Sequence, residues 1–165
     1  MSEAEGNRKR LDYADGYSDV WEIVKDTVKT VLNKQRKGIM LFLDDLPLRL
    51  GAYHPLGSNN IVLNRVLVQI VEASTKSKKL LNALIYTLLL HEYLHALGYV
   101  RESEVRPIVY KVSKQCFGSE HISTRLAESG PWSLLQDLPI DAVNAPKRVM
   151  EIVKDFEKAN QRYIV

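Results

Sequence analysis

Cysteine is almost absent from this sequence, in which Cys116 is the single thiol among 165 residues. One thiol cannot form an internal disulfide, so a small disulfide-stapled scaffold is excluded and a reducing compartment is favoured. Residues 1–10 are rich in charge, and no apolar stretch of the kind found in signal peptides follows them. We therefore expect a cytoplasmic protein in which Cys116, on an apolar helical face, is a buried structural thiol.

A strong excess of charge of one sign is also missing. The net charge is +3 and the pI is about 8.9, and no cluster of aromatic and basic residues accompanies it. We therefore expect neither nucleic acid nor a membrane as a partner. Hydrophobic residues make up 45% and charged residues 26%, which is typical of a globular chain, and the length suits one domain with a substantial core.

The most apolar stretch, residues 80–99, has the length of a helix and is apolar on nearly every side. It carries His91-Glu92-Tyr-Leu-His95, an H-E-x-x-H motif. A membrane span is excluded because Asn82 and the three motif residues would lie inside it, and no flanking anchor is visible. The sequence therefore predicts a helix buried in the core of a globular domain.

The H-E-x-x-H spacing indicates a metal site. Residues i and i+4 lie one turn apart on the same face of a helix, so the imidazoles of His91 and His95 can bind one ion. Glu92 lies beside that face, where it can act as general base toward a metal-bound water. Burying these groups is costly without a ligand, and hydrogen-bonded core histidines are the alternative interpretation. We predict a Zn²⁺ site with His91 and His95 as ligands and Glu92 as catalytic base.

The chain before this helix is predicted to contain a leader, a helix and a short sheet. Residues 1–16 are expected to be flexible, and apolar spacings of three and four then predict a helix over residues 17–37. The basic residues 34–37 are interpreted as helix-end electrostatics rather than an interaction patch. Short apolar runs between turn residues predict three strands, over residues 39–43, 49–53 and 60–64. The last two are expected to form an antiparallel hairpin.

The remaining segments are mainly helical by pattern. Residues 65–73 fit either a short helix or a longer strand, and apolar residues on one face predict a helix over residues 102–117. Residues 121–146 have the turn residues of a loop with a short helix, and residues 147–163 are amphipathic. We expect this last helix to pack onto the domain, with docking to a partner as the alternative. Together the elements predict an α+β fold.

The motif region resembles the catalytic half of a small zincin metallopeptidase, on the residues His91-Glu-Tyr-Leu-His95-Ala-Leu-Gly98-Tyr99 and the hairpin before them. The resemblance covers residues 39–117. It implies that residues 17–165 form a single zincin-like metallopeptidase domain. Such a domain would have an N-terminal helix, a short and mostly antiparallel sheet, the central motif helix and a helical C-terminal part.

A catalytic zinc ion needs a third protein ligand, which the motif does not supply. The metzincin pattern would place a His where this chain has Arg101, and the gluzincin pattern would place a Glu near Gln115. Glu102 lies about 60° from the apolar face of its predicted helix and close in the chain to the motif, so it is the preferred third ligand. His121 and then Glu104 are the alternatives. Acidic residues in a first helical turn also complement the helix dipole without any metal.

The resemblance implies zinc-dependent hydrolysis of a peptide or protein substrate. In zincins an exposed strand pairs with an extended substrate, here residues 60–64 or their hairpin partner. Tyr53 or His54 is then a candidate for stabilising the oxyanion, although His54 also fits an ordinary loop residue.

Two other functions are compatible with parts of the motif. The stretch from His95 to Tyr99 also resembles the bacterial rRNA-maturation endonucleases, which are metal-dependent endoribonucleases. Those enzymes have Gly at the position of Glu92 and a third His at the position of Arg101. The third hypothesis is a zincin-like protein that binds a metal or a partner without turnover. The oligomeric state cannot be predicted from these residues.

Overall fold

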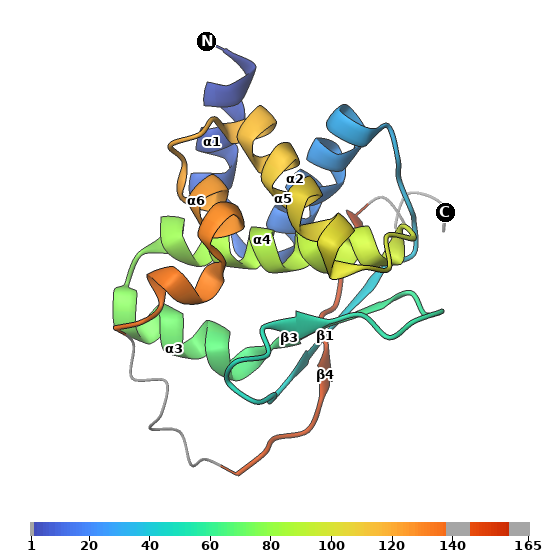
Figure 1. Cartoon of the computed structure of the whole chain (residues 1–165). Helices are drawn as coiled ribbons and strands as arrows, with labels where there is room; N and C mark the ends of the chain where they lie inside the picture. Colours follow the sequence, from blue (N-terminus) through green and yellow to red (C-terminus); the bar gives the residue numbers. More distant parts are fainter. Residues whose placement is uncertain (1, 138–145, 159–165) are drawn as a thin grey trace.

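The computed structural model describes residues 2–137 and 146–158 and has a mixed α+β architecture, as predicted (Figure 1). The described residues form six α-helices, one short 3₁₀-helix and one four-stranded sheet. In chain order the elements are α1 (Glu3–Asp12), α2 (Gly16–Leu32), β1 (Met40–Asp44), β2 (Ala52–Tyr53), β3 (Asn60–Asn64), α3 (Arg65–Thr75), α4 (Lys78–Ala96), α5 (Glu102–Phe117), α6 (Ile122–Ser129), η1 (Pro131–Leu134) and β4 (Glu151–Ile152).

Helix α4 carries the motif and runs through the middle of the molecule. Ser77 caps its N-terminus by accepting a hydrogen bond from the Leu80 amide. Figure 1 shows α1, α2, α5 and α6 on one side of α4, with α3 and the sheet on the other. Because α4 is apolar around most of its circumference, only cover on both sides removes its side chains from water.

The helix ends where Gly98 adopts a φ of 110°, a backbone conformation that side chains with a Cβ disfavour. The Tyr99 amide then donates back to the Leu94 carbonyl at 3.1 Å. This sharp turn brings the first turn of α5 beside the last turn of α4. None of the helices in the described part of the chain combines the length and apolar character needed to cross a membrane.

The sheet has the strand order β2-β3-β1-β4. The predicted hairpin is confirmed, because β2 and β3 pair in antiparallel fashion, although β2 covers only the last part of the predicted strand 49–53. The expectation of a mostly antiparallel sheet is wrong for its longest pairing. Strands β1 and β3 run parallel over five residue pairs, from Met40↔Asn60 to Asp44↔Asn64. Residues 65–73, which the pattern left undecided, are helical in α3, and Asn64 caps that helix.

The expectation of a flexible leader over residues 1–16 is wrong for α1. Ser2 caps this helix, and Leu11 on its inner face is fully buried. The Asn82 side-chain amide on α4 donates to the carbonyls of Leu11 and Ala14, at 2.9 and 3.0 Å. These bonds attach the N-terminal segment to the central helix.

Residues 147–157 do not form the helix predicted over residues 147–163. The segment forms β4, which pairs antiparallel with β1, and the Val153 amide donates to the Leu41 carbonyl at 2.9 Å. Residues 159–163 lie outside the described part of the chain. The segment does pack onto the domain as expected, because Phe156 stacks on the buried Trp21 with ring centroids 4.9 Å apart.

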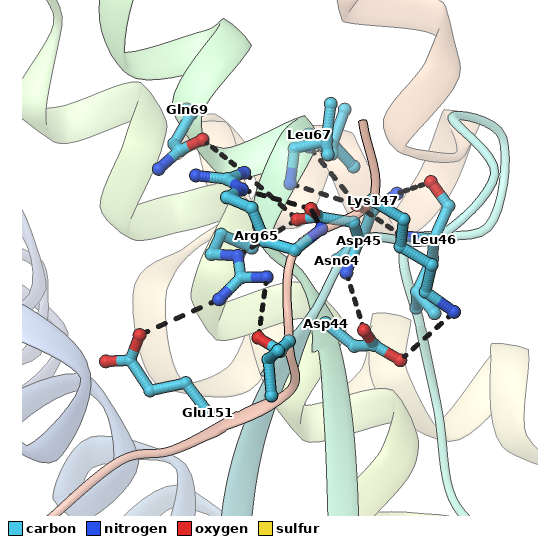
Figure 2. A network of polar contacts seen from close by, with 12 residues as sticks. Asp44, Asp45, Leu46, Asn64, Arg65, Leu67, Gln69, Lys147 and Glu151 are labelled. Atoms are coloured by element: carbon cyan, nitrogen blue, oxygen red, sulfur yellow. Dashed lines mark hydrogen bonds and ion pairs between the residues drawn. The ribbon is translucent and has the colours of Figure 1, made fainter. Parts of the chain in front are cut away.

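An ionic cluster attaches this C-terminal segment to the end of β1 (Figure 2). The Asp45 carboxylate accepts hydrogen bonds from the Arg148 and Arg65 side chains at 2.9 to 3.0 Å, and from the Arg148 amide at 2.8 Å. Arg65 also donates to the Val149 carbonyl at 3.1 Å. The guanidinium of Arg148, and after it that of Arg65, outweigh burial and hold the pKa of Asp45 well below its usual range.

We expect Asp45→Asn to lower the free energy of unfolding by about 1–3 kcal/mol at pH 7, because it removes the closer and more buried of the two carboxylates that pair with the buried Arg65. The pKa of Asp45 is lower in the folded chain than in the unfolded chain. The contribution of Asp45 to the free energy of unfolding is therefore complete above the ordinary Asp pKa of about 4, and it is lost as the pH falls below that value. Urea unfolding of both proteins at several pH values measures this.

The matched control is Asp26→Asn, which removes an exposed ion pair with Arg10 and should cost about 1 kcal/mol or less. Equal unfolding free energies for wild type and Asp45→Asn at pH 7 would contradict the assigned role of the cluster.

Candidate metal centre

Helices α4 and α5 bring three predicted site residues together. His91 and His95 lie one turn apart on α4, with ring centroids 5.1 Å apart. Glu102, the first residue of α5, places its carboxylate 2.9 Å from His91 Nε2 and 2.7 Å from His95 Nε2. One ligand atom from each of the three residues lies within 4.8 Å of the others, a spacing that a single metal ion could bridge.

A backbone carbonyl determines which nitrogen of His95 faces this cluster. His95 Nδ1 lies 2.8 Å from the Tyr99 carbonyl oxygen, which can only accept a hydrogen bond. Nδ1 therefore carries a hydrogen, and Nε2 is the nitrogen that faces Glu102 and would offer its lone pair to a metal ion. Metal-binding histidines commonly have their second nitrogen bound in this way.

The three side chains of the cluster form a site that either a proton or a cation could occupy. Two imidazole nitrogens and a carboxylate meet, and an imidazole lone pair and a carboxylate oxygen repel each other unless a proton or a cation lies between them. Burial lowers the pKa of His91, which favours the neutral, ligand-competent ring. Partial burial would raise the pKa of Glu102, but the hydrogen bond from His91 and the nearby His95 outweigh it and lower that pKa. Two nitrogens and one oxygen are a donor set that suits Zn²⁺.

Glu92 lies next to the cluster without belonging to it. Its side chain is buried, and it lines the same cleft as the two histidines. Burial, opposed by His95 and reinforced by Glu102, raises the pKa of Glu92 to about 7. A carboxyl group of this kind can both accept and return a proton at neutral pH.

The two alternative third ligands lie elsewhere. His121 caps α6, with Nε2 2.9 Å from Asp12 Oδ1 and Nδ1 2.7 Å from Ser123 Oγ, and it borders a separate cavity of about 480 Å³. Glu104 is exposed and lies 3.8 Å from Arg101. The structure therefore brings only the preferred candidate among the three, Glu102, to the histidines.

A cleft of about 980 Å³ opens over the cluster. Its floor is α4, one side is formed by residues 49–54 and Leu56, and the other side is formed by α5, α6 and η1. Gly51 allows the close approach of the first side, because a Cβ at this position would lie 2.7 Å from a Leu88 methyl group. Tyr53 and His54, the candidates for stabilising an oxyanion, both line the cleft.

The strand beside the cleft is β2. Residues 60–64 form β3, which is flanked by β2 and β1 and is not an edge, so its hairpin partner has the exposed edge. The Gly51 carbonyl accepts from the Asn64 amide at 2.9 Å. Because pairing alternates along an antiparallel ladder, the N–H and C=O of Ala52 point away from β3.

Two features of the site were missed in the sequence. The Tyr99 carbonyl is a main-chain group, so no residue type signals its role, although the Gly98 turn that positions it was visible. Gly51 is close to α4 only through tertiary packing, and a glycine before a short strand is also an ordinary turn signal.

If the cluster is a zinc site, we expect Glu102→Ala to bind less zinc than wild type, because it removes one of the three converging side chains, while His121→Ala and Glu104→Ala keep the wild-type zinc content. Zinc per chain, measured by elemental analysis after dialysis, tests this. Full zinc content in Glu102→Ala together with loss in His121→Ala would overturn the assignment of Glu102.

No family model, curated protein or solved structure that was compared with this chain matches it.

Proposed function

We propose that the protein is a zinc-dependent peptidase with a zincin-like site. The observation that carries the proposal is the convergence of His91, His95 and Glu102 beside the buried Glu92, in a cleft bordered by a strand edge. A zinc ion held by the three ligands would supply Lewis-acid activation of water and of the peptide carbonyl. The remaining chemistry belongs to the side chains and backbone of this chain.

Glu92 is the general base in this proposal. It follows His91 on α4 and lines the cleft, so its carboxylate is placed to take a proton from the attacking water and return it to the leaving amine. Its side chain is largely buried, which limits its exposure to bulk water. The exposed Glu104, which faces Arg101, has no such position.

Strand β2 is the proposed binding edge for an extended peptide. The outward N–H and C=O of Ala52 offer main-chain pairing beside α4. His54 Nδ1 lies 2.8 Å from the Asn60 carbonyl and must donate to it, which orients the ring and leaves Nε2 for a substrate. Because pairing with β2 requires free main-chain N–H and C=O groups, we expect an unfolded or extended segment to bind better than a folded protein.

We expect Glu92→Gln to keep wild-type zinc content and to lose cleavage of an unfolded protein by about 10²–10⁴-fold, because the amide cannot take the proton. Elemental analysis and a fluorogenic casein assay measure the two properties. The matched control is Glu104→Gln, which should keep both. Wild type that cleaves RNA and no peptide would favour the endoribonuclease, and wild type that binds zinc and cleaves neither would favour a binding protein.

The far wall of the cleft predicts a preference for large apolar side chains. Leu88 in the floor and Val109 and Leu126 in the side formed by α5, α6 and η1 are buried, and the partly buried Trp132 also lines that side. An apolar side chain placed against them leaves water, whereas a charged one in the same place would lose its hydration.

We expect zinc-loaded Glu92→Gln to bind a leucine-containing peptide about tenfold or more tightly than the same peptide with aspartate in place of leucine. Trp132 emission reports the binding, because Trp21, the other tryptophan, is fully buried away from solvent. Trp132→Phe should abolish the spectral change. Equal affinity for the two peptides would count against the apolar wall as a specificity element.

A further inference from the structure

Arg36 connects the end of the motif helix to the β2–β3 hairpin. It lies in the loop between α2 and β1, among the basic residues interpreted above as helix-end electrostatics. Its guanidinium donates to the carbonyl of Ala96, the last residue of α4, at 2.6 Å. The same guanidinium donates to the Asn59 side-chain oxygen at 2.5 Å and to the Ser58 carbonyl at 3.4 Å. The structure therefore replaces that interpretation for Arg36 with a bridge between the end of α4 and the β2–β3 hairpin.

The backbone of Arg36 is itself held by the motif helix. Its amide donates to the hydroxyl of Tyr93 at 2.8 Å, and Tyr93 lies between the two motif histidines in sequence. The Tyr93 ring is fully buried and meets Trp21 edge-on, with centroids 4.8 Å apart. The loop residue Arg36 is thus anchored to α4 through its backbone, which restricts where its guanidinium can reach.

Hydrogen bonds also hold the β2–β3 turn, which contains the residues that Arg36 contacts. His54 donates to the Asn60 carbonyl, and the Ser58 hydroxyl donates to the Pro55 carbonyl at 2.7 Å, so the turn between β2 and β3 is internally braced. Asn59 also accepts from the Met40 amide through its own carbonyl at 2.8 Å. A displacement of Asn59 is therefore transmitted to β2 and its exposed edge.

We propose that Arg36 is a positioning residue that sets the distance between the β2 edge and the metal-binding turn of α4. The inference rests on the proposed peptidase function, since that function requires a peptide paired with β2 to reach the site. The strand is held at its start by the contact between Gly51 and Leu88 and beyond its end by Arg36. An arginine that only capped the helix would need Ala96 alone and would not contact Asn59.

Three substitutions separate these roles. Arg36→Ala removes both ends of the bridge. Asn59→Ala removes the shorter of the two hairpin contacts and leaves the contacts with the Ser58 and Ala96 carbonyls. Arg36→Lys retains a charge that lacks the planar fork. The exposed neighbour Gln35→Ala is the matched control in the same loop. Because Asn59 is exposed, its substitution leaves the core untouched.

The first measurement is amide hydrogen exchange without substrate. We expect Arg36→Ala and Asn59→Ala to speed exchange in the β2–β3 hairpin relative to Gln35→Ala, while α4 and α5 keep their protection. This comparison does not depend on peptidase activity. If wild type cleaved no peptide, the proposed function would be wrong, but hydrogen exchange would still test whether Arg36 holds the hairpin. Unchanged hairpin exchange in both variants would overturn the inference.

The second measurement is the kinetics of peptide cleavage. We expect KM for a long extended peptide to rise about tenfold or more in Arg36→Ala and Asn59→Ala, with kcat and zinc content close to wild type. A short substrate that does not reach β2 should show no such change, and Arg36→Lys should recover part of the loss. Equal losses for long and short substrates, or loss of zinc, would show a general structural role and overturn the inference.

Discussion

The burial of most of α4 is the constraint on which the rest of the structure depends. A helix that is apolar around most of its circumference must be covered on most sides, and the surrounding helices and the sheet supply that cover. The polar groups it carries then need partners. Asn82 reaches the carbonyls that end α1, whereas His91, Glu92 and His95 lie where the cover opens into a cleft.

The parts of the fold that could be predicted are those that local periodicity determines. The motif helix, the β2–β3 hairpin and α5 follow from apolar spacing and turn residues. The preference for Glu102 also came from helix geometry, because a short connection after Gly98 leaves the first turn of the next helix little freedom. The structure brings Glu102 to the histidines.

The misses share a physical cause, which is that the deciding interactions join segments far apart in the chain. Helix α1 is mostly polar, so its single buried Leu11 and its bonds to Asn82 leave almost no periodic signal. The segment around residues 147–153 has helical spacing, but the open edge of β1 and the Asp45 cluster favour a strand there. Tertiary pairing outweighs local preference in such segments.

The partner of His95 Nδ1 has a consequence for how sites of this kind vary between proteins. That partner is the main-chain carbonyl of residue 99, which orients the His95 ring. The side chain of residue 99 takes no part in this contact, so the contact does not restrict which side chain stands there. The residue type at position 99 is instead determined by other contacts, such as that of the Lys34 ammonium group 4.5 Å from the centre of the Tyr99 ring. What must persist is the backbone path, a left-handed turn three residues after the second histidine and an acidic residue four positions later. A chain could share this geometry while sharing few side chains beyond the two histidines, the turn glycine and the two glutamates.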